Sequence, residues 1–503
     1  MLGVDFGTTQ SKIAYVDPSG NPAIILNDRG HAQTPSVVHV LDGREPLVGT
    51  DAVEQGYVDP AQCLRNFKPR LGTQDNLLRD GRVVNATDAA AMVIAYLKQQ
   101  AEATLGMAVK ECVATCPANF RDHSKQALLE AFERNELKVL ALIPEPTAAG
   151  SAYALEKARS ECTSLVYDFG GGTLDVSALK TEGPQITVLA TEGVPDLGGN
   201  SLNEPLRQLL MEKIVEQFGA MPTPEEDPML YQELDTKTEA AKISLGKRAH
   251  VPCVVGHKGS QVVVELTQEA YHRLIDPLVA QSLDAMDRAV QAAGLTYQDI
   301  SSLLMVGGTS RFPYIQQVVA RHTGLTPKTD IDPEKTIAYG AALACVAEMA
   351  KQGRTATIRG QVIPDPAMFV LDVTAHAVGC CVADNTASGK QLVNAVLIPK
   401  NTPIPCRKTH RFYLEHEDQV AAHIEILQGE PNALRDDCLV IGDLTLDHLP
   451  KEAKRTERIQ VEYIVDRNGM VTATGLDTVS GTSRTVSVDY KKGIKAKDKL
   501  PAA

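Results

Sequence analysis

The sequence predicts an α/β domain made of two similar lobes, followed by an all-β sandwich. Strand-like and helix-like segments alternate from the N-terminus to about residue 350, which is typical of α/β layers. One short motif occurs twice in this part, about 160 residues apart, and indicates an internal duplication with a cleft between the halves. The helical pattern ends near Arg354, and short alternating runs separated by turn residues replace it.

The elements of the first part are expected from residue type and spacing. The expected strands are short, rich in β-branched residues and bounded by Gly, Pro or Asp, whereas the expected helices place apolar residues near i, i+3 and i+4. We predict strands at Met1–Phe6, Lys12–Val16, Cys112–Cys116, Ser164–Asp168, Asp175–Leu179, Ile186–Ala190 and Leu303–Val306. We predict helices at Ala89–Leu105, His123–Asn135, Leu202–Phe218, Tyr231–Leu245, Thr267–Ala293, Pro313–His322 and Thr336–Lys351.

The second part has the pattern of a β-sandwich. We predict strands at Ala422–Leu427, Arg458–Val465, Met470–Thr474 and Thr485–Val488. Asn468-Gly469 lies between two apolar runs and predicts a hairpin turn. The expected domain limits are 1–353 for the α/β domain, 354–371 for a linker containing two prolines, 372–490 for the sandwich and 491–503 for a short basic tail.

Composition excludes several classes of protein. Lys plus Arg number 50 and Asp plus Glu number 63, so the formal net charge of −13 argues against a nucleic-acid-binding role. We find no apolar run of about 18 residues and no signal leader, so we expect no membrane association and a cytoplasmic location. The 10 cysteines lack zinc-site spacing, and we interpret them as small buried hydrophobic residues.

The repeated motif indicates a phosphate site. Its two copies are Asp5-Phe6-Gly7-Thr8-Thr9 and Asp168-Phe169-Gly170-Gly171-Gly172-Thr173. In each copy a strand brings a carboxylate to the sheet edge, glycine lets the backbone approach a phosphate, and amides and threonine hydroxyls donate to its oxygens. The carboxylate needs a cation beside phosphate, so we expect Asp5 and Asp168 to hold Mg²⁺. One copy alone would fit an ordinary strand and turn, but two in duplicated halves predict a clamp on one nucleotide.

A third glycine-rich segment follows a predicted strand. Gly307 and Gly308 would let a nucleoside lie against the backbone, and Arg311 would stack on the base or bond to it. The spacing matches neither the dinucleotide fingerprint nor the P-loop.

Together these segments resemble the nucleotide-binding module shared by actin, sugar kinases and heat-shock chaperones, with duplicated ribonuclease-H-like lobes. Within that group the sequence is most similar to the 70-kDa heat-shock chaperone family. The similar segments follow the family's order over about residues 1–490: Thr115–Phe120, Ile143–Gly150, Asp196–Asn200, Tyr339–Ala342, Val370–Val373, Pro399–Pro405 and Ile424–Glu430.

The resemblance implies a role for each matched residue. Lys68, Glu145, Asp168 and Thr173 would be catalytic in Mg²⁺-dependent ATP hydrolysis, with Lys68 orienting water and neutralising phosphate charge. The residues implied in binding ATP or ADP are the hairpin residues Gly7, Thr8, Thr9, Gly170, Gly171 and Gly172, together with Asp175, Gly198, Gly199, Glu239, Lys242, Gly307, Gly308, Arg311 and Glu334.

The resemblance also implies the partners. They are unfolded or extended polypeptides, a J-domain co-chaperone and a nucleotide-exchange factor. Only about ten residues follow Lys492, so we expect a divergent member without the family's C-terminal helical lid. Phe412, Ile424 and Ile426 fit either the peptide groove or the sandwich core.

Three functions are compatible with these observations. The first is an ATP-dependent chaperone that controls peptide binding and release. The second is an ATP-binding regulatory or scaffold protein that seldom cycles. The third is a small-molecule kinase of the same fold, which would not need the β-domain.

Overall fold

The computed structural model describes residues 2–78, 82–156, 161–328, 332–386, 389–416, 418–451 and 456–487. The chain forms two compact units. Unit 1 comprises Met1–Asn119 and Leu128–Val370, and unit 2 comprises Phe120–Ala127 and Leu371–Ala503. The predicted tail 491–503 and the end of the last predicted strand, Val488, lie outside the described residues.

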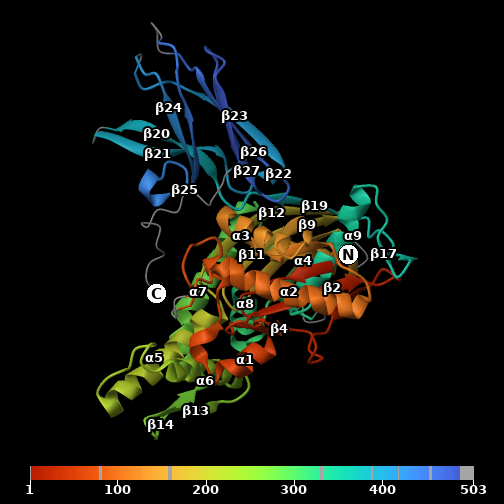
Figure 1. The fold of residues 1–503 in the computed structure, drawn as a ribbon, viewed down its shortest axis with the longest axis vertical. Coiled ribbons are helices and arrows are strands. Elements are labelled where there is room, and N and C mark those ends of the chain that lie inside the picture. Colours follow the sequence, from red (N-terminus) through yellow and green to blue (C-terminus); the bar gives the residue numbers. More distant parts are fainter. Residues whose placement is uncertain are drawn as a thin grey trace. The chain divides into compact units, whose positions relative to one another are not determined.

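Unit 1 contains two larger mixed sheets, which define lobe I and lobe II (Figure 1). The lobe I sheet has the order β3-β2-β1-β8-β9, with β4 pairing to β2. Its strands are β1 (Leu2–Asp5), β2 (Gln10–Val16), β3 (Pro22–Ile25), β4 (Thr34–Pro35), β8 (Glu111–Cys116) and β9 (Lys138–Pro144). The strands of the second sheet that belong to lobe II have the order β16-β15-β10-β11-β12. Its strands are β10 (Cys162–Phe169), β11 (Leu174–Glu182), β12 (Gln185–Val194), β15 (Ser302–Val306) and β16 (Pro327–Lys328).

The two sheets repeat one topology. β1 pairs antiparallel with β2 and parallel with β8, and β10 pairs in the same way with β11 and β15. The registers also correspond, because Asp5 lies opposite Lys12 and Asp168 lies opposite Asp175. The duplication predicted from the repeated motif is therefore confirmed in the fold, and it fixes which positions of the two lobes are equivalent.

Two helices join the lobes. α9 (Thr336–Lys351) packs on β1 and β2, whereas α4 (Glu145–Glu156) packs on β10 and β11. The helices also pack on each other, and a Cβ atom added to Gly340 would lie 1.8 Å from the carbonyl oxygen of Ala148. Glycine is thus required where the two backbones cross.

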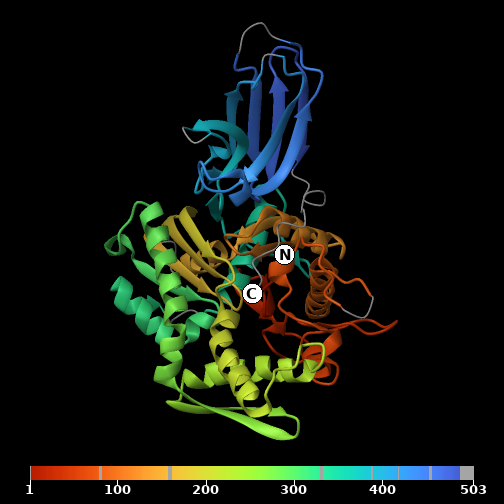
Figure 2. The same ribbon diagram turned by 90° about the vertical axis from the view of Figure 1, so that its left-hand side faces the viewer.

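The other helices of the described residues are α1 (Thr50–Gly56), α2 (Ala86–Leu105), α3 (Asp122–Glu133), α5 (Gly199–Phe218), α6 (Pro228–Leu245), α7 (Gln268–Ala292) and α8 (Pro313–Thr323). They do not all cover these sheets, because α5 and α6 pack on a hairpin that lies away from them (Figures 1 and 2). Three small sheets complete unit 1: β6-β5-β7 (Leu47–Val48, Val38–His39, Cys63–Leu64), β13-β14 (His250–His257, Ser260–Thr267) and β17-β18 (Thr357–Ile358, Gln361–Val362). A single core cluster in lobe II includes Tyr167, Leu206, Leu234 and Ile275.

Unit 2 is a sandwich of two four-stranded sheets, ordered β21-β20-β24-β25 and β23-β26-β27-β28 (Figure 1). The strands of these sheets are β20 (Val378–Thr386), β21 (Gly389–Ile398), β23 (Cys406–Phe412), β24 (Ala422–Gln428), β25 (Leu439–Leu446), β26 (Ile459–Val465), β27 (Val471–Asp477) and β28 (Ser483–Ser487). Two further strands, β19 (Phe369–Val373) and β22 (Pro403–Ile404), pair antiparallel with each other. Ile424 and Ile426 are buried in its core, and Phe412 packs against that core. Of the two interpretations left open for these side chains, the structure supports the core position.

Two further observations concern the whole chain. All 10 cysteines are unpaired, and five of them are buried as expected, whereas Cys63, Cys162, Cys381, Cys406 and Cys438 are only partly buried. Among the helices of the described ranges, none has both the length and the apolar character that a membrane span requires.

Candidate functional site

The tips of the two equivalent hairpins face each other in unit 1. A Cβ atom added to Gly171 would lie 2.6 Å from the Thr9 hydroxyl, and one added to Gly172 would lie 2.7 Å from the Thr8 hydroxyl. Real side chains never approach so closely, so only glycine permits this contact. The repeated motif therefore brings threonines of lobe I against glycines of lobe II.

Each hairpin closes through a tight turn. In lobe II the Gly170 amide donates to the Thr173 carbonyl at 3.1 Å. In lobe I a Cβ atom added to Gly7 would lie 2.1 Å from the Gln10 carbonyl oxygen. The Ser36 hydroxyl also donates to the Gly7 carbonyl at 2.7 Å, which fixes the lobe I turn from the outside.

A buried ion pair lies beside these turns. Lys68 Nζ is 2.8 Å from Glu145 Oε1, and both side chains are buried. Burial lowers the pKa of Lys68, but the charges of Glu145 and Asp5 raise it by more, so the ammonium form is favoured. Burial raises the pKa of Glu145, and Lys68 partly offsets this effect. The structure thus brings Lys68, Glu145 and Asp5 together, although they are far apart in the sequence.

The two carboxylates of the lobe II hairpin repel each other. Burial and the charges of Glu145, Asp175 and Asp5 hold the pKa of Asp168 well above its ordinary value. Burial and the charge of Glu145 raise the pKa of Asp175 to about 7, even though the backbone amide of Asn119 donates to Asp175 Oδ1 at 3.1 Å. Within the described part of the chain, the Oδ2 atoms of Asp168 and Asp175 are buried without a hydrogen-bond partner. Such oxygens are ready to receive a cation.

This arrangement fits a magnesium ion better than a metal site made of protein ligands alone. No group of three or more His, Cys, Asp or Glu side chains suited to hold a metal occurs among the described residues. Mg²⁺ is usually bound through one or two carboxylates together with waters and substrate phosphates. The unpartnered oxygens of Asp168 and Asp175 match that pattern.

The lobe I hairpin differs, because its carboxylate already has a cationic partner. Lys12 Nζ is 3.2 Å from Asp5 Oδ2, and their side chains are only 11% and 5% exposed. Sequence reasoning missed Lys12. A signal was present, since Lys12 follows Asp5 by seven positions, as Asp175 follows Asp168.

The N-terminus of α5 is hydrogen-bonded to the lobe II hairpin. The amides of Gly199 and Asn200 donate to the carbonyls of Gly170 and Gly171 at 2.9 and 2.8 Å. The amide of the N-cap residue Gly198 donates to the Ser201 hydroxyl at 2.8 Å. Of the two predicted glycines of this segment, Gly199 therefore supports the hairpin through its amide, whereas the Gly198 amide closes the first turn of α5.

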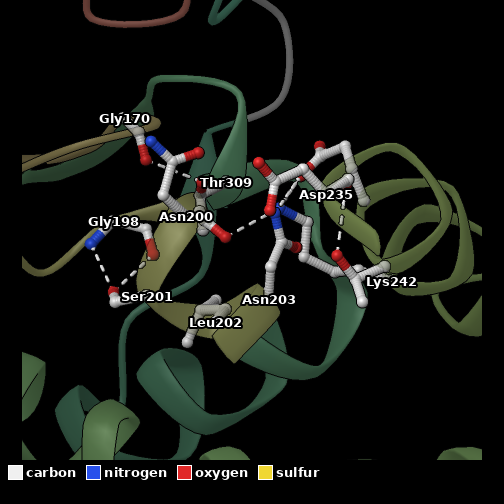
Figure 3. Close-up of polar contacts among 12 residues, drawn as sticks. Gly170, Gly198, Asn200, Ser201, Leu202, Asn203, Asp235, Lys242 and Thr309 are labelled. Carbon is white, nitrogen blue, oxygen red and sulfur yellow. Dashed lines mark hydrogen bonds and ion pairs between the residues drawn. The ribbon is translucent and has the colours of Figure 1, made fainter. Parts of the chain in front are cut away.

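Two predicted residues of α6 reach the same place. Lys242 Nζ lies 2.6 Å from Glu239 Oε2 and donates to the Gly199 carbonyl at 2.9 Å. Burial lowers the pKa of Lys242, and Glu239 opposes that effect. Asn203, which sequence reasoning did not select, donates from its amide to Glu239 at 2.7 Å. Figure 3 draws Lys242 and Asn203 near the Gly198–Leu202 turn.

The third glycine segment closes the site on the lobe II side. Gly307 has a φ of +82°, and a Cβ atom there would lie 2.4 Å from the Phe169 carbonyl oxygen and 2.8 Å from Asp168 Oδ1. The Thr309 hydroxyl donates to the Gly170 carbonyl at 2.7 Å (Figure 3). By contrast, a Cβ atom on Gly308 would meet no described atom within 4 Å. Gly307 is therefore packed against the hairpin, while Gly308 faces open space.

A polar chain crosses between the lobes near this segment. Arg311 Nη1 lies 2.9 Å from Glu334 Oε1, and Gln33 donates from its amide to the other oxygen of Glu334. Gln33 precedes β4 of lobe I, whereas Arg311 follows β15 of lobe II. Arg311 and Glu334, each expected separately to bind the nucleotide, thus form an ion pair, and Gln33 is an addition that the sequence did not signal.

The chain is similar to known proteins over nearly its whole length. The family model described as Hsp70 protein matches residues 1–84 and 73–500. The chaperone protein DnaK of Thermotoga neapolitana is 32% identical over 505 residues, which cover 99% of this chain and 82% of that protein. The proteins of the same name from Thermotoga petrophila and Thermotoga maritima are 32% identical over 495 residues, covering 97% of this chain and 80% of each protein.

Proposed function

The chain belongs to the 70-kDa heat-shock protein family, and on that premise we propose that it hydrolyses ATP to control the binding and release of unfolded polypeptide segments. The relatives named above are called chaperone proteins, and they match both the lobed unit and the sandwich. The domain limits expected from the sequence, and its cytoplasmic location, remain predictions.

The observation that carries the proposal is the opposition of the two hairpins. Gly171 and Gly172 of one lobe approach Thr9 and Thr8 of the other, beside a buried cluster of carboxylates and ammonium groups. Backbone amides and hydroxyls that converge in this way are suited to the oxygens of a triphosphate. A nucleotide held there would be gripped from both lobes.

Lys68 and Glu145 are the proposed catalytic pair. The Lys68 ammonium, held by Glu145 at 2.8 Å, would offset the charge that develops on the γ-phosphoryl group. The Glu145 carboxylate, whose pKa burial raises, would accept a hydrogen bond from the attacking water. Thr173, at the end of the lobe II turn, would donate its hydroxyl to the same phosphate.

A magnesium ion bound with the nucleotide would neutralise phosphate charge and orient the phosphates. The unpartnered oxygens of Asp168 and Asp175 support these two residues as its holders. Asp175 takes the place of Asp5, the second holder expected from the sequence, because Asp5 is already paired with Lys12. Burial and neighbouring negative charges raise the pKa of both carboxyl groups, so a bound cation would compete with a proton there and would favour their charged form.

The nucleoside would lie toward α6 and the third glycine segment. Glu239 and Lys242 would contact the ribose and base from one side, and Arg311 with Glu334 from the other. The open space beside Gly308 supports this direction, because a flat base needs a surface without side chains.

Unit 2 is the proposed site for extended polypeptide. Tyr413 and Val420, in the connection between β23 and β24, are each 51% exposed and offer apolar contacts. An extended peptide would add backbone hydrogen bonds to such contacts. A J-domain co-chaperone and a nucleotide-exchange factor are the proposed regulators of the cycle.

Single-turnover hydrolysis tests the catalytic assignment. We expect Lys68→Ala to slow hydrolysis by about 10²-fold or more, since a positioned charge is lost from the transition state. The matched control is Lys180→Ala, which removes an exposed lysine paired with Glu182 on β11. Equal rates for wild type and Lys68→Ala would leave an ATP-binding scaffold as the better description.

Peptide stimulation tests the chaperone assignment. We expect an apolar heptapeptide to raise the steady-state ATPase rate, and ATP to speed release of a fluorescent copy of that peptide. Unchanged rates in both assays would contradict coupling between nucleotide and polypeptide.

A further inference from the structure

We propose that Lys12 is a built-in cation of the phosphate site, which neutralises Asp5 so that a metal ion is recruited by the lobe II carboxylates alone. Lys12 would thereby be a positioning residue for nucleotide binding. This inference rests on the proposed binding of nucleotide between the two hairpins.

The first support is the geometry of the pair. Lys12 lies directly opposite Asp5 in the β1–β2 register, and its ammonium nitrogen is 3.2 Å from the Asp5 carboxylate. Both side chains are largely buried, so water screens the pair little. A single positive charge therefore stays at the root of the lobe I turn that carries Thr8 and Thr9.

The second support is the equivalent position in lobe II. There the residue opposite Asp168 is Asp175, so the same place carries a negative charge. The lobe II pair has unpartnered carboxylate oxygens within the described residues, whereas Asp5 Oδ2 is held by Lys12. The duplicated frame thus presents one carboxylate that already has a cation and two that lack one.

The charge balance shows why this matters for an anionic ligand. Asp5, Glu145, Asp168 and Asp175 are balanced in part by Lys68 and Lys12. Without Lys12, one further negative charge would face the incoming phosphates in a buried site. The repulsion between the carboxylates and the phosphates, which are all negative, is strong there because the effective dielectric constant is low.

ADP binding measured by isothermal titration calorimetry tests the inference without relying on turnover. We expect Lys12→Met to weaken ADP binding in the presence of Mg²⁺ by about tenfold. Lys12→Ala should weaken binding as well, and methylammonium chloride should restore part of its loss, because the shortened side chain leaves room for a small cation, whereas tetramethylammonium chloride at equal ionic strength should not. Lys12→Arg should retain most of the affinity, and the exposed control Lys180→Met should bind as wild type does.

The outcomes separate the inference from the proposed function. If wild type does not bind ADP, both fail. If wild type binds and Lys12→Met binds equally well, or if neither methylammonium nor Lys12→Arg recovers the affinity, only the inference is overturned. If circular dichroism shows that Lys12→Met does not fold, the two salts are compared on wild type alone. The ADP affinity of wild type should be the same in methylammonium chloride and in tetramethylammonium chloride. A higher affinity in methylammonium chloride would show that the cation position beside Asp5 is not filled by Lys12, and would overturn the inference.

Discussion

The β1–β2 hairpin of lobe I and the β10–β11 hairpin of lobe II have the same topology and register but opposite charge at one position. Lys12 stands opposite Asp5, whereas Asp175 stands opposite Asp168. The first pair is a salt bridge, and the second is a pair of carboxylates whose pKa values are raised. Duplication therefore preserved the backbone frame, while the side chains gave the two halves different electrostatic tasks.

The turns differ in a complementary way. Lobe I carries Thr8 and Thr9, and lobe II carries Gly171 and Gly172 at the facing positions. Side chains on both turns would collide, and glycines on both would leave fewer hydroxyl donors. A site at the junction of two copies can thus become asymmetric although its scaffold is symmetric.

The largest effect is expected from filling the glycine side of this contact. Gly171→Val would place a branched side chain where even an added Cβ atom would lie 2.6 Å from the Thr9 hydroxyl, so the two turns must separate. We expect single-turnover ATP hydrolysis to fall by about 10²-fold, because the reacting groups lose alignment. Gly256→Ala on β13, where a Cβ atom has only an ordinary contact at 3.6 Å, is the control and should retain the wild-type rate.

The second test compares the carboxylates of the two hairpins. Asp168→Asn should reduce Mg²⁺-dependent ADP affinity by about tenfold or more, since a cation holder is lost. Asp5→Asn should change the Mg²⁺ dependence less, because Lys12 already occupies the Asp5 carboxylate. Titration of ADP at several Mg²⁺ concentrations measures both, and a larger loss of Mg²⁺ dependence for Asp5→Asn would reverse the assignment.

The third test uses pH. The pKa of Asp175 is raised to about 7 in the folded protein, so the folded state binds this proton more tightly than the unfolded state does. The contribution of Asp175 to the free energy of unfolding is therefore lost as the pH rises through 7. Asp175→Asn removes the charge while keeping an oxygen for the Asn119 amide. Without nucleotide or metal, we expect it to melt about 3 °C higher than wild type at pH 8, with the gain vanishing below about pH 4. An increase in melting temperature that became larger at acid pH would contradict the raised pKa of Asp175.

The smallest effect is expected where a polar contact bridges the lobes outside the charged cluster. Gln33→Ala removes the amide that bonds Glu334, but leaves the Arg311–Glu334 pair. Stopped-flow release of fluorescent ADP should be about threefold faster, in keeping with one partly exposed hydrogen bond. A change as large as that of Gly171→Val would mean that this bridge, and not the hairpins, holds the lobes together.

Much of the fold followed from periodicity. The predicted helix Thr336–Lys351 is α9, and the predicted Thr267–Ala293 became α7, with the Thr267 hydroxyl capping its first turn. The helix α4 was not predicted, because its small residues give no apolar stripe and it was interpreted only as a segment of family resemblance. The β13–β14 hairpin was also missed, since His250–His257 mixes polar and apolar residues without a turn signal beyond Lys258-Gly259.

The candidate site was predictable where the chemistry repeats. Asp5, Asp168 and the glycines belong to a duplicated motif, so the sequence indicated them without the structure. The spacing of Lys12 from Asp5 matches that of Asp175 from Asp168, but the residue types differ, and a lysine in a strand is usually a solvated residue. The register, which sets Lys12 opposite the buried Asp5 carboxylate, shows what that spacing means. Gln33 and Asn203 depend on tertiary contacts for the same reason.

The central claim is that Asp168 and Asp175 hold the metal while Lys12 remains paired with Asp5. A crystal structure with a non-hydrolysable ATP analogue and Mn²⁺ in place of Mg²⁺ tests this claim most directly. The anomalous signal should place the metal beside Asp168 and Asp175, with the phosphates between the two turns and the Lys12 ammonium still on Asp5. A metal bound to Asp5 with Lys12 displaced, or a nucleotide outside the two turns, would contradict it.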